Sequence, residues 1–124
     1  MKKIFVIDDE KNIRILIKKY LENEGYKAYL YSDGNNVLSD IRRVNPDLLV
    51  LDIMMKGING LELCKKIRKE FDTPIIFVSA RGDEIDRIVG LEIGADDYLS
   101  KPFSPRELVI RINKIFKRMK RVRD

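Results

Sequence analysis

Short apolar runs alternate along the chain with longer segments in which apolar residues recur every three or four positions. A short, continuous apolar run is typical of a buried strand, whereas a recurrence every three or four positions is typical of an amphipathic helix. The pattern predicts strands over residues 2–7, 26–31, 48–53, 74–78 and 98–99, and helices over residues 12–21, 33–43, 61–70, 83–93 and 104–119.

Local signals mark several ends of the predicted helices. Gly25 and Gly94 follow the first and fourth helices, and glycine readily adopts the left-handed conformation that commonly ends a helix. Ser104 is the predicted N-cap of the last helix, with Pro105 at its first position, where proline is well tolerated. These signals favour five separate helices between the strands.

Strands and helices alternate five times, which is typical of an α/β fold with a parallel sheet. Because the strands are apolar throughout, helices are expected to cover both faces of the sheet. Right-handed crossovers then give an open, five-stranded, doubly wound sheet, whose ligands bind at the carboxyl ends of the strands. Residues 1–120 are predicted to form one domain, and residues 121–124 to begin a linker.

Polar side chains follow four of the five predicted strands, at the point where each strand ends. Any one of them has an ordinary explanation as a helix cap, a turn residue or a solvated charge. Their common position favours a site at one edge of the sheet instead. They are Asp8, Asp9 and Glu10 after the first strand, Asp52 at the end of the third, Ser79 after the fourth and Lys101 after the fifth.

The chemistry of this group indicates phosphoryl transfer. Clustered carboxylates repel one another and favour a hard cation such as Mg²⁺, which prefers oxygen ligands. A lysine and a hydroxyl are donors that could hold the oxygens of a phosphoryl group. An aspartate can itself be the nucleophile in such a transfer.

Composition excludes several other kinds of site. The chain has 124 residues, the size of one domain, with one cysteine and no histidine. An internal disulfide, a cysteine metal cluster and a histidine-based triad are therefore excluded, and Cys64 is interpreted as a core thiol. Apolar runs such as 4–7 are far shorter than the roughly 18 residues that cross a bilayer, so a cytoplasmic protein without a membrane partner is predicted.

The net charge of +5 is concentrated at the C-terminal end of the chain. Residues 111–124 hold seven basic residues and one acidic residue, which leaves 18 basic and 19 acidic residues in 1–110. A general nucleic-acid-binding surface on the body is therefore not supported. For the basic segment the pattern favours a solvated helix end, where cations complement the helix dipole, over a contact with DNA.

The chain resembles the receiver domain of bacterial response regulators, which has a flavodoxin-like, CheY-like fold. The resemblance covers essentially the whole chain, and residues 94–103 with Glu107 and Leu108 resemble the OmpR/PhoB subclass. Members of that subclass carry a C-terminal winged-helix DNA-binding domain, and this chain ends where the linker to it would begin. The matching motifs are residues 7–10, 51–55 with Gly60, 78–80 and 101–103.

The resemblance implies a phosphoacceptor and a metal site. Asp52 would accept a phosphoryl group from the histidine of a sensor kinase. Asp8 and Asp9 would bind Mg²⁺, together with Asp52 and the main-chain carbonyl of Met54. Phosphorylation would switch the domain to a dimer that regulates transcription through a DNA-binding domain outside this chain.

The resemblance also implies how the signal is read. Lys101 would pair with Asp52 or with its phosphoryl group, and Ser79 would hydrogen-bond to the phosphoryl group. Tyr98 would be the switch aromatic residue, turning inward as Ser79 moves. The peptide bond between Lys101 and Pro102 would be cis, which is an ordinary option only before proline.

A dimer surface is predicted on the fourth and fifth helices and the strand between them. Ile88, Leu91 and Ile110 would form a small apolar centre, and the alternative is a merely solvated amphipathic surface. The resemblance implies that charged pairs between subunits surround this centre. The pairs are Arg87 with Glu107, Asp97 with Arg111 and Asp96 with Arg118.

The chain departs from the family pattern at three positions near the site. Lys56 stands where the family commonly has proline, and it is either solvated or attracts an acidic phosphodonor. Ser79 replaces the more frequent threonine and keeps the hydroxyl. Arg81 stands where the family varies the residue that governs water access.

Two other functions on related folds remain as alternatives. A phosphatase of the aspartyl-phosphate type needs a second aspartate two residues after the nucleophile, where this chain has Met54. A flavodoxin-like binder needs a phosphate-binding loop rich in serine, threonine or glycine after the first strand, where this chain has three acids. A stand-alone signalling receiver is a further alternative.

Overall fold

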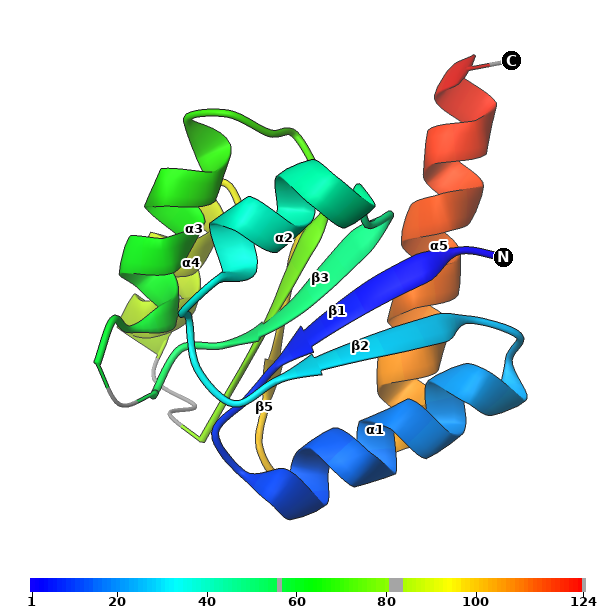
Figure 1. Cartoon of the computed structure of the whole chain (residues 1–124), viewed down its shortest axis with the longest axis horizontal. Helices are drawn as coiled ribbons and strands as arrows, with labels where there is room; N and C mark the ends of the chain where they lie inside the picture. Colours follow the sequence, from blue (N-terminus) through cyan, green and yellow to red (C-terminus); the bar gives the residue numbers. More distant parts are fainter. Residues whose placement is uncertain (56, 81–83, 124) are drawn as a thin grey trace.

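Ten elements alternate along the chain in the computed structural model, which describes residues 1–55, 57–80 and 84–123 (Figure 1). Each predicted strand and helix has a counterpart, so the alternation expected from the apolar pattern is confirmed. The elements are β1 (Lys3–Ile7), α1 (Lys11–Asn23), β2 (Lys27–Tyr31), α2 (Val37–Val44), β3 (Leu48–Asp52), α3 (Gly60–Arg68), β4 (Ile75–Ser79), α4 (Glu84–Ile93), β5 (Asp97–Ser100) and α5 (Pro105–Arg123).

All neighbouring strands of the sheet are parallel, in the order β2-β1-β3-β4-β5. β1 lies beside both β2 and β3, so the strand order reverses at β1. In open α/β sheets such a reversal leaves a crevice at the carboxyl ends of the strands, where ligands bind. The register aligns Ile7 with Leu51, which places the residues that follow them, Asp8 and Asp52, next to each other.

The two faces of the sheet are covered by different helices (Figure 1). Alternate strand residues point to opposite faces, and both sets are apolar here. In β1, Phe5 and Ile7 join the core under α2, α3 and α4, whereas Ile4 and Val6 join the core under α1 and α5. The three inner strands β1, β3 and β4 are apolar at successive positions because helices bury them on both faces, as expected for a doubly wound sheet.

The structure differs from the sequence prediction at the start of the second helix. That helix begins at Val37, four residues later than the predicted range 33–43. The Asp33 side chain accepts a hydrogen bond from the Asn35 backbone N–H at 2.8 Å, and Asn36 adopts a left-handed φ of 66°. Turns of this kind compete with helix formation, because asparagine and aspartate readily bond to nearby backbone groups.

The last helix also ends later than predicted, at Arg123 instead of about residue 119. Its final turns contain lysine and arginine, which are good helix formers, and no glycine or proline. Prediction and structure agree on its start at Pro105. In the described part of the chain, no helix is long and apolar enough to cross a membrane.

Candidate functional site

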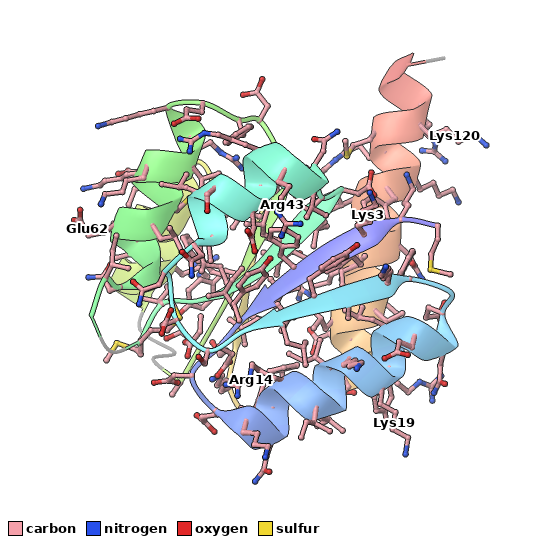
Figure 2. All side chains as sticks on the ribbon, viewed as in Figure 1. Lys3, Arg14, Lys19, Arg43, Glu62 and Lys120 are labelled. Atoms are coloured by element: carbon pink, nitrogen blue, oxygen red, sulfur yellow. The ribbon has the colours of Figure 1, made fainter. Side chains whose placement is uncertain are left out.

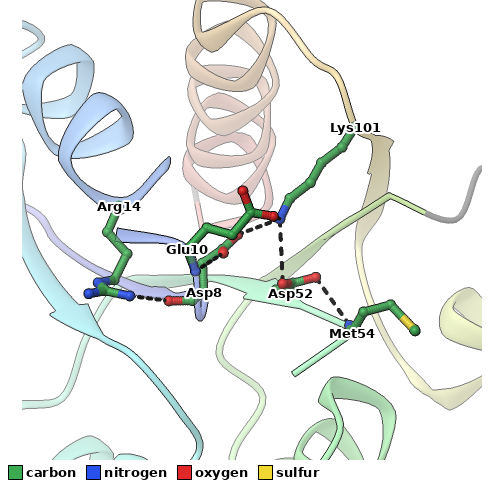
Figure 3. A network of polar contacts seen from close by, with 6 residues as sticks. All are labelled: Asp8, Glu10, Arg14, Asp52, Met54 and Lys101. Carbon is green, nitrogen blue, oxygen red and sulfur yellow. Dashed lines mark hydrogen bonds and ion pairs between the residues drawn. The ribbon is translucent and has the colours of Figure 1, made fainter. Parts of the chain in front are cut away.

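The carboxyl edge of the sheet brings together the acids that follow β1 and β3. Asp8 and Asp52 are each 2% exposed, although both are carboxylic acids. Lys101, which follows β5, reaches across the edge so that its Nζ lies 2.9 Å from Asp8 Oδ2 and 3.4 Å from Asp52 Oδ2 (Figure 3). The predicted convergence of these strand-end residues is thus observed.

Lys101 is shared among three carboxylates instead of belonging to Asp52. Its shortest contact is with Asp8, and Glu10 Oε1 is 3.5 Å away (Figure 3). One ammonium therefore faces Asp8, Glu10 and Asp52, which leaves the group with excess negative charge. A divalent cation would offset that excess.

Backbone donors hold the two buried aspartates in position. The Glu10 N–H donates to Asp8 Oδ1 at 2.9 Å, and the Met54 N–H donates to Asp52 Oδ1 at 3.1 Å (Figure 3). Arg14 from α1 donates to the Asp8 carbonyl oxygen at 2.8 Å. The sequence analysis missed these contacts, although an aspartate that accepts from the N–H two residues later is a common turn, and that tendency was a usable signal.

Burial and charge shift the ionisation of the central pair. Burial raises the pKa of Asp52 to about 6, with a further increase from Asp8 and a decrease from Lys101. Burial lowers the pKa of Lys101, but Asp8, Asp52 and Glu10 outweigh it, so its pKa is raised. Lys101 is thus a fixed cation beside an acid whose charged form is disfavoured in the absence of metal.

The donor chemistry of this edge fits Mg²⁺. Carboxylate oxygens of Asp8, Asp9 and Glu10 lie within 4.8 Å of one another, and such hard oxygen donors are the ligands that Mg²⁺ prefers. A cavity of about 620 Å³ opens beside Asp9, Glu10 and Met54, and it leaves room for the waters that Mg²⁺ retains. Among the described residues, the acids present therefore suit a divalent cation.

Comparison with known proteins identifies the family. The family model described as response regulator receiver domain matches residues 4–113, nearly the whole chain. The chain belongs to the response regulator receiver domain family. Receiver domains generally bind Mg²⁺ at an acidic pocket, interact with histidine kinases and dimerise when activated.

Solved receiver structures resemble this one closely. The Francisella response regulator 1452 receiver domain is 41% identical, with 96% of this chain and 99% of that chain covered and a TM-score of 0.90. The BeF3-activated N-terminal receiver domain of Klebsiella pneumoniae RstA is 31% identical, with 90% and 96% covered and a TM-score of 0.85. A two-component response regulator from Clostridium difficile is 30% identical, with 96% and 98% covered and a TM-score of 0.92.

Two further residues that the sequence predicts near the site, Ser79 and Tyr98, lie in strands and are buried. Ser79 at the end of β4 is fully buried, and the Lys101 N–H donates to its carbonyl oxygen at 2.7 Å. Tyr98 in β5 is buried in the core under α2, α3 and α4, so its ring is turned inward in this structure. The peptide bond between Lys101 and Pro102 is cis, as predicted. Lys56 and Arg81 lie outside the described residues.

The predicted apolar centre of the dimer surface is exposed in this receiver domain. Ile88 and Leu91 on α4 are 45% and 41% exposed, and Ile110 on α5 is 51% exposed. Most large apolar side chains of the described chain are buried, so three exposed ones on neighbouring elements are a notable surface feature.

All three predicted interface acids, Asp96, Asp97 and Glu107, have partners within the described chain. Arg111 Nη1 donates to Asp97 Oδ1 at 2.8 Å, and its Nη2 donates to Glu107 Oε1 at 3.0 Å. Asp96 accepts from the Ile75 backbone N–H at 2.9 Å and lies 3.3 Å from Arg68. The sequence analysis missed Arg68, because nothing in the local pattern links α3 to the turn before β5.

Replacing Asp52 is expected to stabilise the metal-free receiver domain near neutral pH. Its native pKa of about 6 exceeds the ordinary 3.8, so between these values the native state holds a proton that the unfolded chain releases. Stability therefore falls as pH rises from about 4 to about 6. Asp52→Asn removes this cost and should raise the free energy of unfolding at pH 7 by about 1–3 kcal/mol.

Urea unfolding of both proteins in EDTA, at pH 4 and pH 7, measures this effect. The difference between the variant and the wild type should be larger at pH 7 than at pH 4. If the variant is no more stable than the wild type at pH 7, the prediction that ionised Asp52 destabilises the native state is wrong.

Gly60 at the start of α3 fixes the loop that carries Met54. Its backbone N–H donates to the Ile53 carbonyl oxygen at 2.9 Å, and an added Cβ would lie 2.3 Å from the Asp52 carbonyl oxygen. We expect Gly60→Ala to lower the free energy of unfolding by about 1–3 kcal/mol, because backbone must move to admit the methyl group. Chemical denaturation checks this, and an unchanged midpoint would refute the close contact.

Proposed function

We propose that this receiver domain accepts a phosphoryl group on Asp52 from the phosphohistidine of a sensor histidine kinase. The observation that supports this most is the buried Asp52 carboxylate, held beside Lys101 and Asp8 at the carboxyl edge of the sheet. Mg²⁺ would be held by Asp8, Asp9, Asp52 and the main-chain carbonyl of Met54. The domain acts as a regulatory phosphoacceptor, with only weak self-phosphorylation and autodephosphorylation.

The transfer uses few groups of the chain. The Asp52 carboxylate attacks phosphorus, so an O–P bond forms while the N–P bond of the phosphohistidine breaks and its electron pair stays on the imidazole nitrogen. Lys101 lies 3.4 Å from Asp52 and can move its ammonium onto the phosphoryl oxygens, and the Ser79 hydroxyl donates to them. Mg²⁺ held by these ligands would supply positive charge to offset the negative charge that develops on the transferred group.

Incubation with Mg²⁺ and acetyl phosphate tests this function. Intact-protein mass spectrometry should show the gain of one phosphoryl group, followed by slow decay. A phosphatase of the aspartyl-phosphate type would instead release phosphate in steady turnover without accumulating a phosphoprotein. Met54 stands where such an enzyme has its second aspartate, so turnover is not expected.

The output of the domain is proposed from its similarity to activated receivers. Similarity to the BeF3-activated RstA receiver supports membership of the OmpR/PhoB subclass. In that case a cytoplasmic protein would regulate transcription through a DNA-binding domain outside this chain, and a stand-alone signalling receiver is the alternative. Phosphorylation would shift an existing equilibrium towards a dimer formed by α4, β5 and α5.

Arg111→Glu is expected to weaken this dimer. In the wild type, the Arg111 guanidinium neutralises both Asp97 and Glu107. The variant instead places a third carboxylate beside these two acids. Exposed pairs are each worth ~0–1 kcal/mol, so they set the register of the dimer, while Ile110 contributes apolar burial at its centre.

Sedimentation of the beryllofluoride-treated protein at low salt measures the dimer. We expect a dimer for the wild type, and a dissociation constant raised at least about tenfold by Arg111→Glu, since three like charges then face the partner. Lys66→Glu on α3 is the matched control and should dimerise normally. An activated wild type that stays monomeric, or a dimer indifferent to Arg111→Glu, would overturn the assigned surface.

A further inference from the structure

The C-terminal half of α5 carries cations that no described carboxylate neutralises. Arg111, at the start of this segment, is paired with Asp97 and Glu107. The basic residues at positions 114–121 are exposed, and none of them has an ion pair with another described residue. We call them the basic α5 end: Lys114, Lys117, Arg118, Lys120 and Arg121.

These side chains project beyond the body of the domain. Asn113 accepts a hydrogen bond from Tyr26, and Phe116 lies under Lys2, whose Nζ is 4.8 Å from the ring centroid. Both contacts are at the amino ends of β1 and β2, so the turns after Phe116 extend past the sheet (Figure 1). Within this segment, the Lys120 side chain points away from the body of the domain (Figure 2).

The cations form one continuous surface. Lys114, Lys117, Arg118 and Arg121 follow the three-and-four spacing that aligns side chains on one face of a helix, and Lys120 adjoins them. At 1.5 Å per residue, this face is about 10 Å long. Lys2, whose Nζ lies over the Phe116 ring, adds a sixth cation beside it.

The apolar side of the same helix is already used. Ile112 and Ile115 are buried in the core under α1 and α5, and Phe116 and Met119 are partly buried against that core. Beyond Ile110, no large apolar side chain among the described residues of α5 is exposed. Without a free apolar face this segment would not insert into a bilayer, so only charge would hold it to a lipid surface. Duplex DNA carries a denser row of phosphates, about one charge per 1.7 Å of its axis, and is the stronger attraction for these cations.

We propose that the basic α5 end binds the phosphate backbone of duplex DNA without reading its sequence. The contact is charge against charge, so it is weak and sensitive to salt. α5 runs antiparallel to the strands, which places this surface at the opposite end of the helix from the acidic site (Figure 1). The acids of the site therefore face away from the DNA and do not compete with it for these cations.

Fluorescence anisotropy with a labelled duplex of about 20 base pairs tests the proposal on this chain. About four phosphate contacts predict an affinity that falls roughly 100-fold between about 50 mM and about 200 mM salt. Lys117→Glu, Lys120→Glu and Arg121→Glu together should lower the affinity at 50 mM salt by at least about tenfold, because the three cations become repelling charges. None of these three residues belongs to the proposed phosphoryl site or dimer surface.

The matched control replaces three exposed lysines on the far side of the sheet by glutamate and has the same net charge as the test variant. They are Lys65 and Lys66 on α3 and Lys69 at its C-cap. It should bind DNA within a few-fold of the wild type. Circular dichroism melting checks that both triple variants are folded. No binding by the wild type at low salt, equal losses in the two variants, or equal binding to anionic phospholipid vesicles would overturn the proposal.

Discussion

Asp52→Asn should abolish phosphorylation of this receiver domain by acetyl phosphate and by a histidine kinase. An amide has no charged oxygen with which to attack phosphorus, whereas its shape and its acceptor oxygen are retained, so the Met54 N–H keeps a partner. Lys101 keeps its shorter contact with Asp8, and the fold should survive with increased stability. Phosphoprotein yield, measured by intact mass, should fall to background.

The control for this result is Asp33→Asn, which removes a carboxylate that lines the neighbouring cavity beside Asp9, Glu10 and Met54. Asp33 has no contact with Asp52 or Lys101 among the described interactions, and its variant should be phosphorylated at close to the wild-type yield. An Asp52→Asn protein that still gains a phosphoryl group at the wild-type yield would show that another residue is the acceptor.

Asp9→Ala should lower Mg²⁺ affinity and the rate of phosphorylation together. Asp9 is exposed at the cavity, where its carboxylate lies within 4.8 Å of those of Asp8 and Glu10. Removing a direct ligand should weaken Mg²⁺ by at least about tenfold, because even outer-shell partners of metal ligands are worth 10–100-fold. Isothermal titration with Mg²⁺ and the initial rate with acetyl phosphate give the two quantities.

Glu10→Gln is the control that separates the loss of Mg²⁺ affinity in Asp9→Ala from the effect of removing any negative charge. Glu10 belongs to the same acidic cluster, but its Oε1 is 3.5 Å from Lys101 and its side chain is largely exposed. We expect its variant to bind Mg²⁺ within a few-fold of the wild type. Phosphorylation of the wild type at an unchanged rate in excess chelator would contradict a metal-dependent transfer.

The fold was predictable because apolar strands that alternate with amphipathic helices are typical of a parallel sheet covered by helices on both faces. In β3, residues 48–51 are apolar at successive positions, and a strand buried on both faces requires helices on both sides. The site followed from the same logic, since parallel strands end at a common edge and Asp8, Asp52 and Lys101 each follow or end a strand. This inference needed no information about which residues far apart in the sequence lie close together in space.

Contacts set by side-chain reach were not predictable. The flexible side chain of Lys101 can reach either acid, and only its position in three dimensions shows that Asp8 is nearer than Asp52. The same holds for Arg68, which donates to the carbonyl oxygens of Gly94 and Thr73 at 2.9 Å and 2.7 Å and thereby joins α3 to two loops. Such long-range polar contacts depend on the packed backbone and leave no periodic trace in the sequence.

The balance of charge at the acidic edge gives a physical reason for the proposed phosphoacceptor and the proposed metal site to lie together. Lys101 alone faces Asp8, Glu10 and Asp52, and burial makes the ionised form of Asp52 costly. A divalent cation on the acids would stabilise that ionised form, which is the nucleophile. Metal binding and reactivity of Asp52 are therefore expected to be coupled.

The most direct test of the central claim is to locate the phosphoryl group on the chain. The protein is treated with Mg²⁺ and acetyl phosphate, the acyl phosphate is reduced with borohydride to an alcohol, and the peptides are sequenced by mass spectrometry. The account predicts that the reduced side chain is found at Asp52 and is absent without Mg²⁺. Modification at Asp8, Asp9 or a serine, with Asp52 unmodified, would contradict it.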